Sequence, residues 1–144
     1  MLTTRDMALE LSRYCIPWTP FGRKVRDATV MLVSTAGIYH PPDPPFEVEG
    51  DLSFRRIPGN ATAAELRYAD AHYPHDCIDA DLNCVFPIDR LAELAREQRI
   101  AGVTELHFST GFTMALREFR DSTLPALVKE VVQQRPGAVL LTGG

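Results

Sequence analysis

The sequence predicts a three-layer α/β domain with a mainly parallel sheet, and three runs of strand length lead to this prediction. Residues 28–35 and 138–142 are almost continuously apolar, as in strands that a parallel sheet buries on both faces. Residues 103–109 alternate apolar and polar side chains, as in a strand nearer the edge. Each run ends in small residues, at the position where open α/β sheets bind their ligands.

Composition limits the possible functions. The chain has 144 residues, 45% of them hydrophobic and 24% charged, which suits one packed domain over residues 1–144. A net charge of −4 offers no basic surface for nucleic acid, and no apolar run approaches the roughly 18 residues that span a bilayer. The N-terminus has no apolar signal core, and three Cys residues suggest no disulfide framework. We expect a cytoplasmic protein that binds neither nucleic acid nor membrane.

Residues 1–27 are expected to form an N-terminal helix and an arm before the first strand. Thr3 or Thr4 can cap a short helix, because a hydroxyl accepts a bond from the first free N–H groups. Two prolines, Pro17 and Pro20, keep the following arm extended.

The segment 38–60 is too long and too rich in proline for an ordinary connection. Loops of this length inside a compact domain are usually functional. Residues 46–48 and 53–57 are expected to pair as a small hairpin. Asp51 and Arg55 either close this hairpin or belong to a functional loop; the residues alone leave both readings open.

Three helical segments are expected in the rest of the chain. Asn60 or Thr62 can cap a helix over residues 63–71. A second helix follows Pro87, a residue that suits a first helical turn because it has no N–H to leave unpaired. A third is expected over residues 114–134, with a break or kink near Pro125.

The stretch from residue 76 to residue 91 is the most informative part of the chain. It contains Asp76, Asp79, Asp81 and Asn83 within eight residues and then enters a helix. A polar loop that ends at a helix N-terminus can hold an anion. The alternative is that Asp81 and Asn83 only cap the helix and satisfy the loop backbone.

The cysteine and histidine residues nearby do not predict a metal site. His72, His75, Cys77 and Cys84 have a spacing that matches none of the regular zinc patterns, so no metal and no cofactor are expected. Cys84 precedes an apolar Val-Phe pair and is expected to pack as a small apolar side chain rather than to act as a redox partner.

Four segments of the sequence resemble a known family. VMLVSTAGIY, GDLSFRRIPGNAT, DLNCVFPIDRL and VLLTGG are similar to the selenocysteine-containing subunit of D-proline reductase, and more loosely to the protein B component of glycine, sarcosine and betaine reductases. The segments come in family order, and the resemblance extends back to Trp18. It implies an oxidoreductase subunit that acts on a small amino acid and assembles with a pyruvoyl-type partner subunit or with itself.

The resemblance also implies a mechanism. A selenolate attacks the bound amino acid and breaks the bond between its α-carbon and nitrogen; the selenocysteine follows the strand that ends in Thr142-Gly143-Gly144. On this comparison the chain contains no catalytic nucleophile. Because UGA encodes selenocysteine, the codon after Gly144 is expected to be UGA, with further strands and helices completing the sheet beyond it.

The expected substrate-binding residues lie mostly at strand ends and in the loops that follow. They are His40, His72, Asp81, Asn83, His107, Ser109, Thr142 and Gly143. For His40 and His107, packing is the competing interpretation. We expect these loops to converge on one cleft at the carboxyl edge of the sheet.

The sequence therefore predicts the amino-terminal, pocket-forming part of a selenoprotein reductase subunit that reductively cleaves a C–N bond of D-proline, glycine or a related amino acid. One alternative is a non-catalytic binding or assembly module of the same fold. Another is an isomerase- or racemase-like enzyme that uses Cys77 or Cys84.

Overall fold

A computed structural model of the chain describes residues 20–143. The expected N-terminal helix with its Thr3 or Thr4 cap, Cys15, most of the proline-bounded arm and Gly144 lie outside the described residues.

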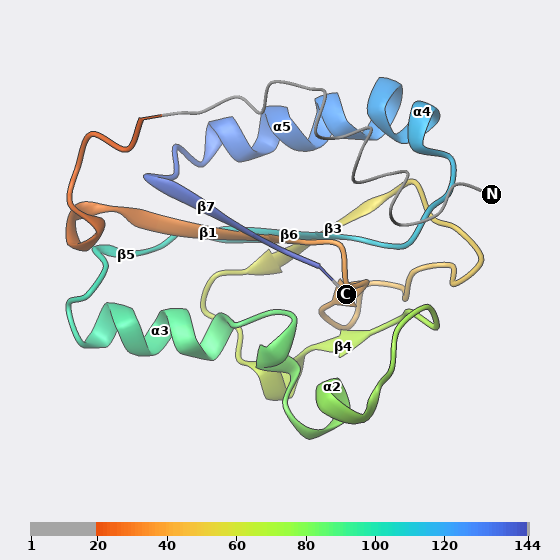
Figure 1. The fold of residues 1–144 in the computed structure, drawn as a ribbon, viewed down its shortest axis with the longest axis horizontal. Helices are drawn as coiled ribbons and strands as arrows, with labels where there is room; N and C mark the ends of the chain where they lie inside the picture. Colours follow the sequence, from red (N-terminus) through yellow and green to blue (C-terminus); the bar gives the residue numbers. More distant parts are fainter. Residues whose placement is uncertain (1–19, 144) are drawn as a thin grey trace, which may run out of the picture.

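The described residues form an α/β fold around a mainly parallel sheet (Figure 1). Its strands are β1 (Thr29–Ser34), β3 (Phe54–Pro58), β5 (Gly102–Val103), β6 (Leu106–Thr110) and β7 (Ala138–Thr142). β1 pairs in parallel with β5, β6 and β7, whereas β3 runs antiparallel to β6. The predicted fold class is therefore confirmed.

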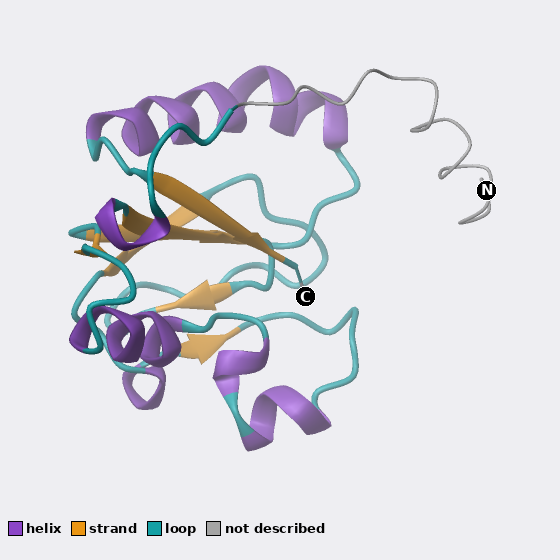
Figure 2. Cartoon of the chain, turned by 60° about the vertical axis from the view of Figure 1, so that its left-hand side comes forward, coloured by secondary structure: helices purple, strands orange, loops and turns teal. Residues whose placement is uncertain are grey.

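β1 separates two apolar layers, as its unbroken apolar sequence predicts. Met31 and Leu32 point to opposite faces of the sheet, and both are fully buried. Met31 packs with Phe108 and Leu127 on one face. Leu32 belongs to a larger core on the other face. Figure 2 shows helices on both sides of the sheet, so the fold has three layers.

The helices cover the sheet with their apolar faces. α3 (Ile88–Arg96) begins directly after Pro87, as predicted, and buries Ile88 and Leu91 in the larger core. α5 (Leu124–Gln133) covers the other face through Leu127. No helix within residues 20–143 is long and apolar enough to cross a membrane.

The predicted irregularity near Pro125 is present as a change of helix type. α4 (Leu116–Glu118) passes into the π-helical turn η4 (Phe119–Thr123), which leads directly into α5. Pro125 lies in the first turn of α5, directly after η4, and has no N–H to donate to the preceding turn.

The predicted hairpin between residues 46–48 and 53–57 is wrong. β3 pairs with β6 instead, from Phe54 opposite Thr110 to Pro58 opposite Leu106. This pairing buries Ile57 completely and sets Phe54 edge-on to Phe108, with ring centroids 6.0 Å apart. A five-residue pairing in the main sheet thus replaces the short local hairpin.

The predicted helix over residues 63–71 is also wrong. Thr62 caps the segment together with Glu65 in a capping box, but this box starts only the 3₁₀ turn η2 (Ala63–Glu65). β4 (Arg67–Tyr68) then pairs antiparallel with β2 (Ile38–Tyr39) and buries Leu66 nearby. Tertiary pairing overrides local helix propensity here.

The polar stretch before α3 is more regular than predicted. It contains the short helix α2 (Asp76–Ala80) and the 3₁₀ turn η3 (Leu82–Cys84). Ile78 buries one side of α2 in the larger core.

Candidate functional site

A cleft of about 390 Å³ lies at the carboxyl ends of β1 and β6, the edge where open α/β sheets bind ligands. Thr35 follows β1, and Thr110 ends β6; both line the cleft. Phe112 and Phe119 supply apolar wall. A larger hollow of about 510 Å³ lies near residues 24–26 and 98–100, before the amino ends of β1 and β5, and so away from this edge.

An ordered carboxylate–imidazole pair lines the cleft. Asp70 Oδ1 accepts the backbone N–H of His72 at 2.6 Å and lies 3.2 Å from His72 Nδ1. The Asp70 side chain is only 4% exposed and that of His72 is 38% exposed. The imidazole stacks on Phe112 with 3.5 Å between ring centroids. Two contacts therefore fix the plane of the His72 ring.

Tyr73 adds a hydroxyl to the same cleft. Its O–H donates to the carbonyl of Ala36 at 2.9 Å, which ties the segment after β4 to the end of β1. Burial, together with the nearby charge of Asp70, raises the pKa of Tyr73 above its ordinary value. Tyr73 therefore stays protonated and acts as a donor at neutral pH.

His107 and Ser109 lie inside the core and do not line this cleft. The N–H of Leu32 donates to His107 Nδ1 at 3.1 Å, and the Ser109 hydroxyl accepts the N–H of Ile38 at 2.9 Å. Burial lowers the pKa of His107 to about 4, so the ring is neutral at pH 7. His107 is therefore placed as a packed core residue, as the competing interpretation of its role expected.

Asp81 and Asn83 lie in a separate hollow beside α3. Asp81 accepts the backbone N–H of Asn83 at 2.9 Å, and Asn83 Oδ1 accepts the N–H of Asp89 at 3.0 Å. Hydrogen bonds from the Asn83 side chain and backbone lower the pKa of Asp81. These contacts are those of capping groups for η3 and α3, as in the second of the two readings of this stretch.

The end of β7 reaches the rim of the cleft through Thr35. The Thr35 N–H donates to the carbonyl of Thr142 at 3.1 Å, and a Cβ at Gly143 would lie 3.8 Å from the Thr35 hydroxyl. His40 follows β2 and does not line the cleft. The predicted convergence is therefore partial: the structure brings His72 and the end of β7 to one edge.

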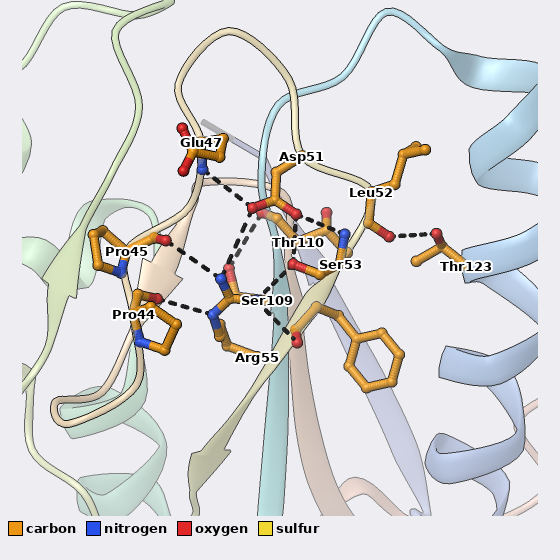
Figure 3. A network of polar contacts seen from close by, with 11 residues as sticks. Pro44, Pro45, Glu47, Asp51, Leu52, Ser53, Arg55, Ser109, Thr110 and Thr123 are labelled. Carbon is orange, nitrogen blue, oxygen red and sulfur yellow. Dashed lines mark hydrogen bonds and ion pairs between the residues drawn. The ribbon is translucent and has the colours of Figure 1, made fainter.

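A polar network anchors the long loop to this edge (Figure 3). Asp51 accepts the N–H groups of Glu47 and Ser53, at 3.1 and 2.7 Å, and lies 3.8 Å from Arg55. The Asp51 N–H donates to the carbonyl of Phe112 at 2.8 Å. Burial opposes ionisation of Asp51, but these hydrogen bonds and Arg55 outweigh it and lower the pKa of the carboxyl group.

Arg55 completes the network by binding the proline-rich part of the loop. Its guanidinium donates to the carbonyls of Pro44 and Pro45 at 3.0 and 3.3 Å and lies over the Phe46 ring, 4.3 Å from the centroid. Asp51 and Arg55 thus hold a loop against Phe112, the ring on which His72 stacks, and they do not close a hairpin.

Sequence reasoning missed Asp70, the most buried carboxylate of the cleft. An available signal was the spacing Asp-x-His, because an Asp side chain commonly accepts the N–H two residues later. Cys77 and Cys84 are exposed and do not line the cleft, so the expected packing of Cys84 as a small apolar side chain is wrong. Within the described range, no three His, Cys, Asp or Glu side chains form a group that could hold a metal ion.

Comparisons with known proteins give one informative match. No protein-family profile matches the chain. No solved structure matches it either. The chain is 34% identical over 128 residues to the D-proline reductase subunit gamma of Acetoanaerobium sticklandii, an alignment that covers 88% of this chain and 53% of that protein. The chain thus spans about half the length of its curated relative. Over most of its own length, the chain is similar to a D-proline reductase subunit.

Proposed function

We propose that the chain forms the cleft-bearing part of a D-proline reductase-type subunit and takes part in reductive cleavage of a C–N bond in D-proline, glycine or a related amino acid. The observation that carries this proposal is the 34% identity to the D-proline reductase subunit over 88% of the chain. The cleft at the carboxyl edge of the sheet, where open α/β sheets bind ligands, supports it.

The lining of the cleft supports a small amino acid as substrate. The hydroxyl groups of Thr35, Thr110 and Thr113 are donors for a carboxylate, and the rings of Phe112 and Phe119 suit the apolar part of a pyrrolidine ring. A small cleft with few polar groups and an aromatic wall fits such a ligand better than an extended one.

In this proposal, a selenolate or thiolate of the assembled enzyme is the nucleophile. The chain leaves β7 at the rim of the cleft, where Thr142 and Gly143 meet Thr35. The family resemblance implies a selenocysteine directly after Gly144. A residue at that position would follow the rim of the cleft, within reach of a bound substrate. A selenol is ionised more readily than a thiol, whose ordinary pKa is about 8.5, and so attacks at neutral pH.

The experiment is a D-proline reduction assay on the natural subunit, purified with its partner subunits. Opening of the ring at the bond between Cα and nitrogen converts D-proline into 5-aminopentanoate. We expect this product to form from D-proline with a dithiol as reductant. Absence of reduction with D-proline, glycine, sarcosine and betaine alike would contradict the proposal.

A binding or assembly module is the second candidate, because several apolar side chains of β7 and α5 are exposed. Leu141 on β7 is 73% exposed and Val132 on α5 is 65% exposed, and Val139, Leu140 and Val128 are also exposed. Apolar surface of this kind marks contact sites between proteins. We therefore include association with a pyruvoyl-type subunit or a second copy in the proposal. An assembled complex that binds D-proline without reducing it would favour this second candidate.

A further inference from the structure

We propose that Asp70 and His72 form an acid–base pair in the cleft, in which His72 gives a proton to the amino nitrogen of the substrate as the C–N bond breaks. This inference rests on the proposed function and adds to it a catalytic residue and a positioning residue.

The geometry leaves one nitrogen of His72 available. Nδ1 lies 3.2 Å from the buried Asp70 carboxylate, which can only accept, so Nδ1 carries the hydrogen of that bond. Nε2 then remains for a ligand. The Phe112 ring, stacked 3.5 Å away, restricts rotation of the imidazole, and both rings line the cleft. A carboxylate that orients an imidazole in this way is a recurring arrangement in acid–base catalysis.

The other described histidines lack this combination. His107 is completely buried with Nε2 unpaired, and its low pKa keeps it neutral. His75 is packed edge-on between Tyr68 and Tyr73, with ring centroids 5.0 and 5.6 Å away. Among the histidines that the structure describes, His72 alone pairs with a carboxylate and lines the cleft.

The chemistry of the proposed reaction needs such a group. A thiolate or selenolate of the complex forms a bond to Cα, and the electron pair of the C–N bond goes to nitrogen. The nitrogen leaves poorly as an anion, so the imidazolium of His72 protonates it and becomes neutral. A thiol of the reductant then takes the sulfur or selenium from Cα as a disulfide or selenenyl sulfide, while Cα takes a second proton. In total, the amino acid takes up two electrons from the reductant and two protons.

Asp70 has a structural role that the test has to separate from positioning. Its bond to the backbone N–H of His72 is a local turn contact, which an Asn side chain would preserve. Its contact with Nδ1 uses the same oxygen, Oδ1, so an Asn side chain also keeps an acceptor for the Nδ1 hydrogen and lacks only the negative charge. The Asp70→Asn variant therefore keeps the turn and the acceptor for Nδ1 and removes only the charge of the carboxylate.

The experiment compares wild type, His72→Gln and Asp70→Asn in the assembled complex, with D-proline as substrate, across a range of pH. The matched control is Asp43→Asn, which changes an exposed carboxylate. We expect His72→Gln to lower kcat by about 10²- to 10⁴-fold with little change in KM, and to remove one limb of the pH–rate profile. Asp70→Asn should lower kcat less than His72→Gln does, while the control stays at wild-type rate.

A second readout does not depend on turnover. Nitrogen NMR spectra should show the hydrogen on Nδ1 of the neutral His72 ring in wild type and in Asp70→Asn, because an oxygen at the Oδ1 position accepts in both. A wild-type complex that reduces no D-proline would overturn the proposed function and this step with it. An active wild type with His72→Gln within threefold of its kcat, or with the hydrogen on Nε2 in the neutral wild-type ring, would overturn the acid–base pair alone.

Discussion

Individual side chains in this protein set the pH range over which the fold is stable. His107 accepts the N–H of Leu32 through Nδ1, which only an unprotonated nitrogen can do. Its pKa of about 4 lies below the ordinary 6.5, so the unfolded chain takes up this proton more readily than the folded one. Stability from this group is complete above about pH 6.5 and declines as the pH falls towards 4.

The first prediction concerns this pH dependence. Acidification from pH 7 to 4 should lower the free energy of unfolding through His107 by at most about 3 kcal/mol. In His107→Leu the slope over this range should become shallower, although Leu32 loses its acceptor and stability at pH 7 falls by about 1–3 kcal/mol. Urea titrations at several pH values measure both effects. Equal slopes in the two proteins would contradict the assignment. The lowered pKa of Asp51 acts separately, below its ordinary value of 3.8.

The second prediction concerns the packing of Gly111 at the cleft. A Cβ at this position would lie 2.8 Å from the Phe46 ring, which is itself held beneath Arg55. We expect Gly111→Ala to destabilise the fold by about 1–3 kcal/mol, because the ring has little space to move. Gly22→Ala is the control, since no atom lies within 4 Å of its added Cβ. Thermal unfolding of both variants measures the difference, and equal midpoints would contradict the packing argument.

At the scale of elements, the sequence identifies what depends on local pattern and misses what depends on distant partners. β1 and α3 were predictable because a continuous apolar run and a proline-started amphipathic helix each carry their own signal. The pairing of β3 with β6 joins segments about fifty residues apart, and no local feature specifies it. For the same reason the sequence indicated His72 but not its partner Asp70, whose burial is a tertiary property.

The third prediction concerns the loop held by Arg55. Arg55→Lys should loosen residues 44–53. The planar guanidinium of Arg55 binds Asp51 and the carbonyls of Pro44 and Pro45 at once, and a single ammonium group cannot reproduce this geometry. Hydrogen exchange at the Glu47 and Ser53 amides, both donated to Asp51, should accelerate. Arg56→Lys is the matched control. Arg56 pairs with Glu130 outside this network. Equal exchange in both variants would show that Arg55 does not hold the loop.

At the scale of the whole molecule, β7 forms an edge of the main sheet. One side of the strand pairs with β1 along its full length, from Ala138 to Thr142. On its other side no strand is present within residues 20–143. An apolar strand with unpaired backbone groups readily adds a further strand, and Figure 1 shows this edge on the outside of the sheet.

The fourth prediction concerns this edge. Leu141→Lys should weaken assembly of the complex, because a charge would be buried in the proposed contact. Light scattering after size exclusion should show a shift to smaller species. Val25→Lys, at an apolar position that is 60% exposed and precedes the amino end of β1, whereas Leu141 lies near the carboxyl end of β7, should leave assembly unchanged. An unaltered mass for Leu141→Lys would place the contact elsewhere.

The reversed direction of β3 has a consequence for how relatives of this protein diverge. Because β3 runs opposite to its neighbour, its first residue, and not its last, stands at the ligand edge. The loop before it therefore reaches Gly111 and Phe112 without belonging to any strand pair. Insertions, deletions and exchanges in this loop can reshape the cleft while the register from Phe54 to Pro58 is kept. The shape of the cleft can thus change through one segment while the strands of the sheet keep their pairing.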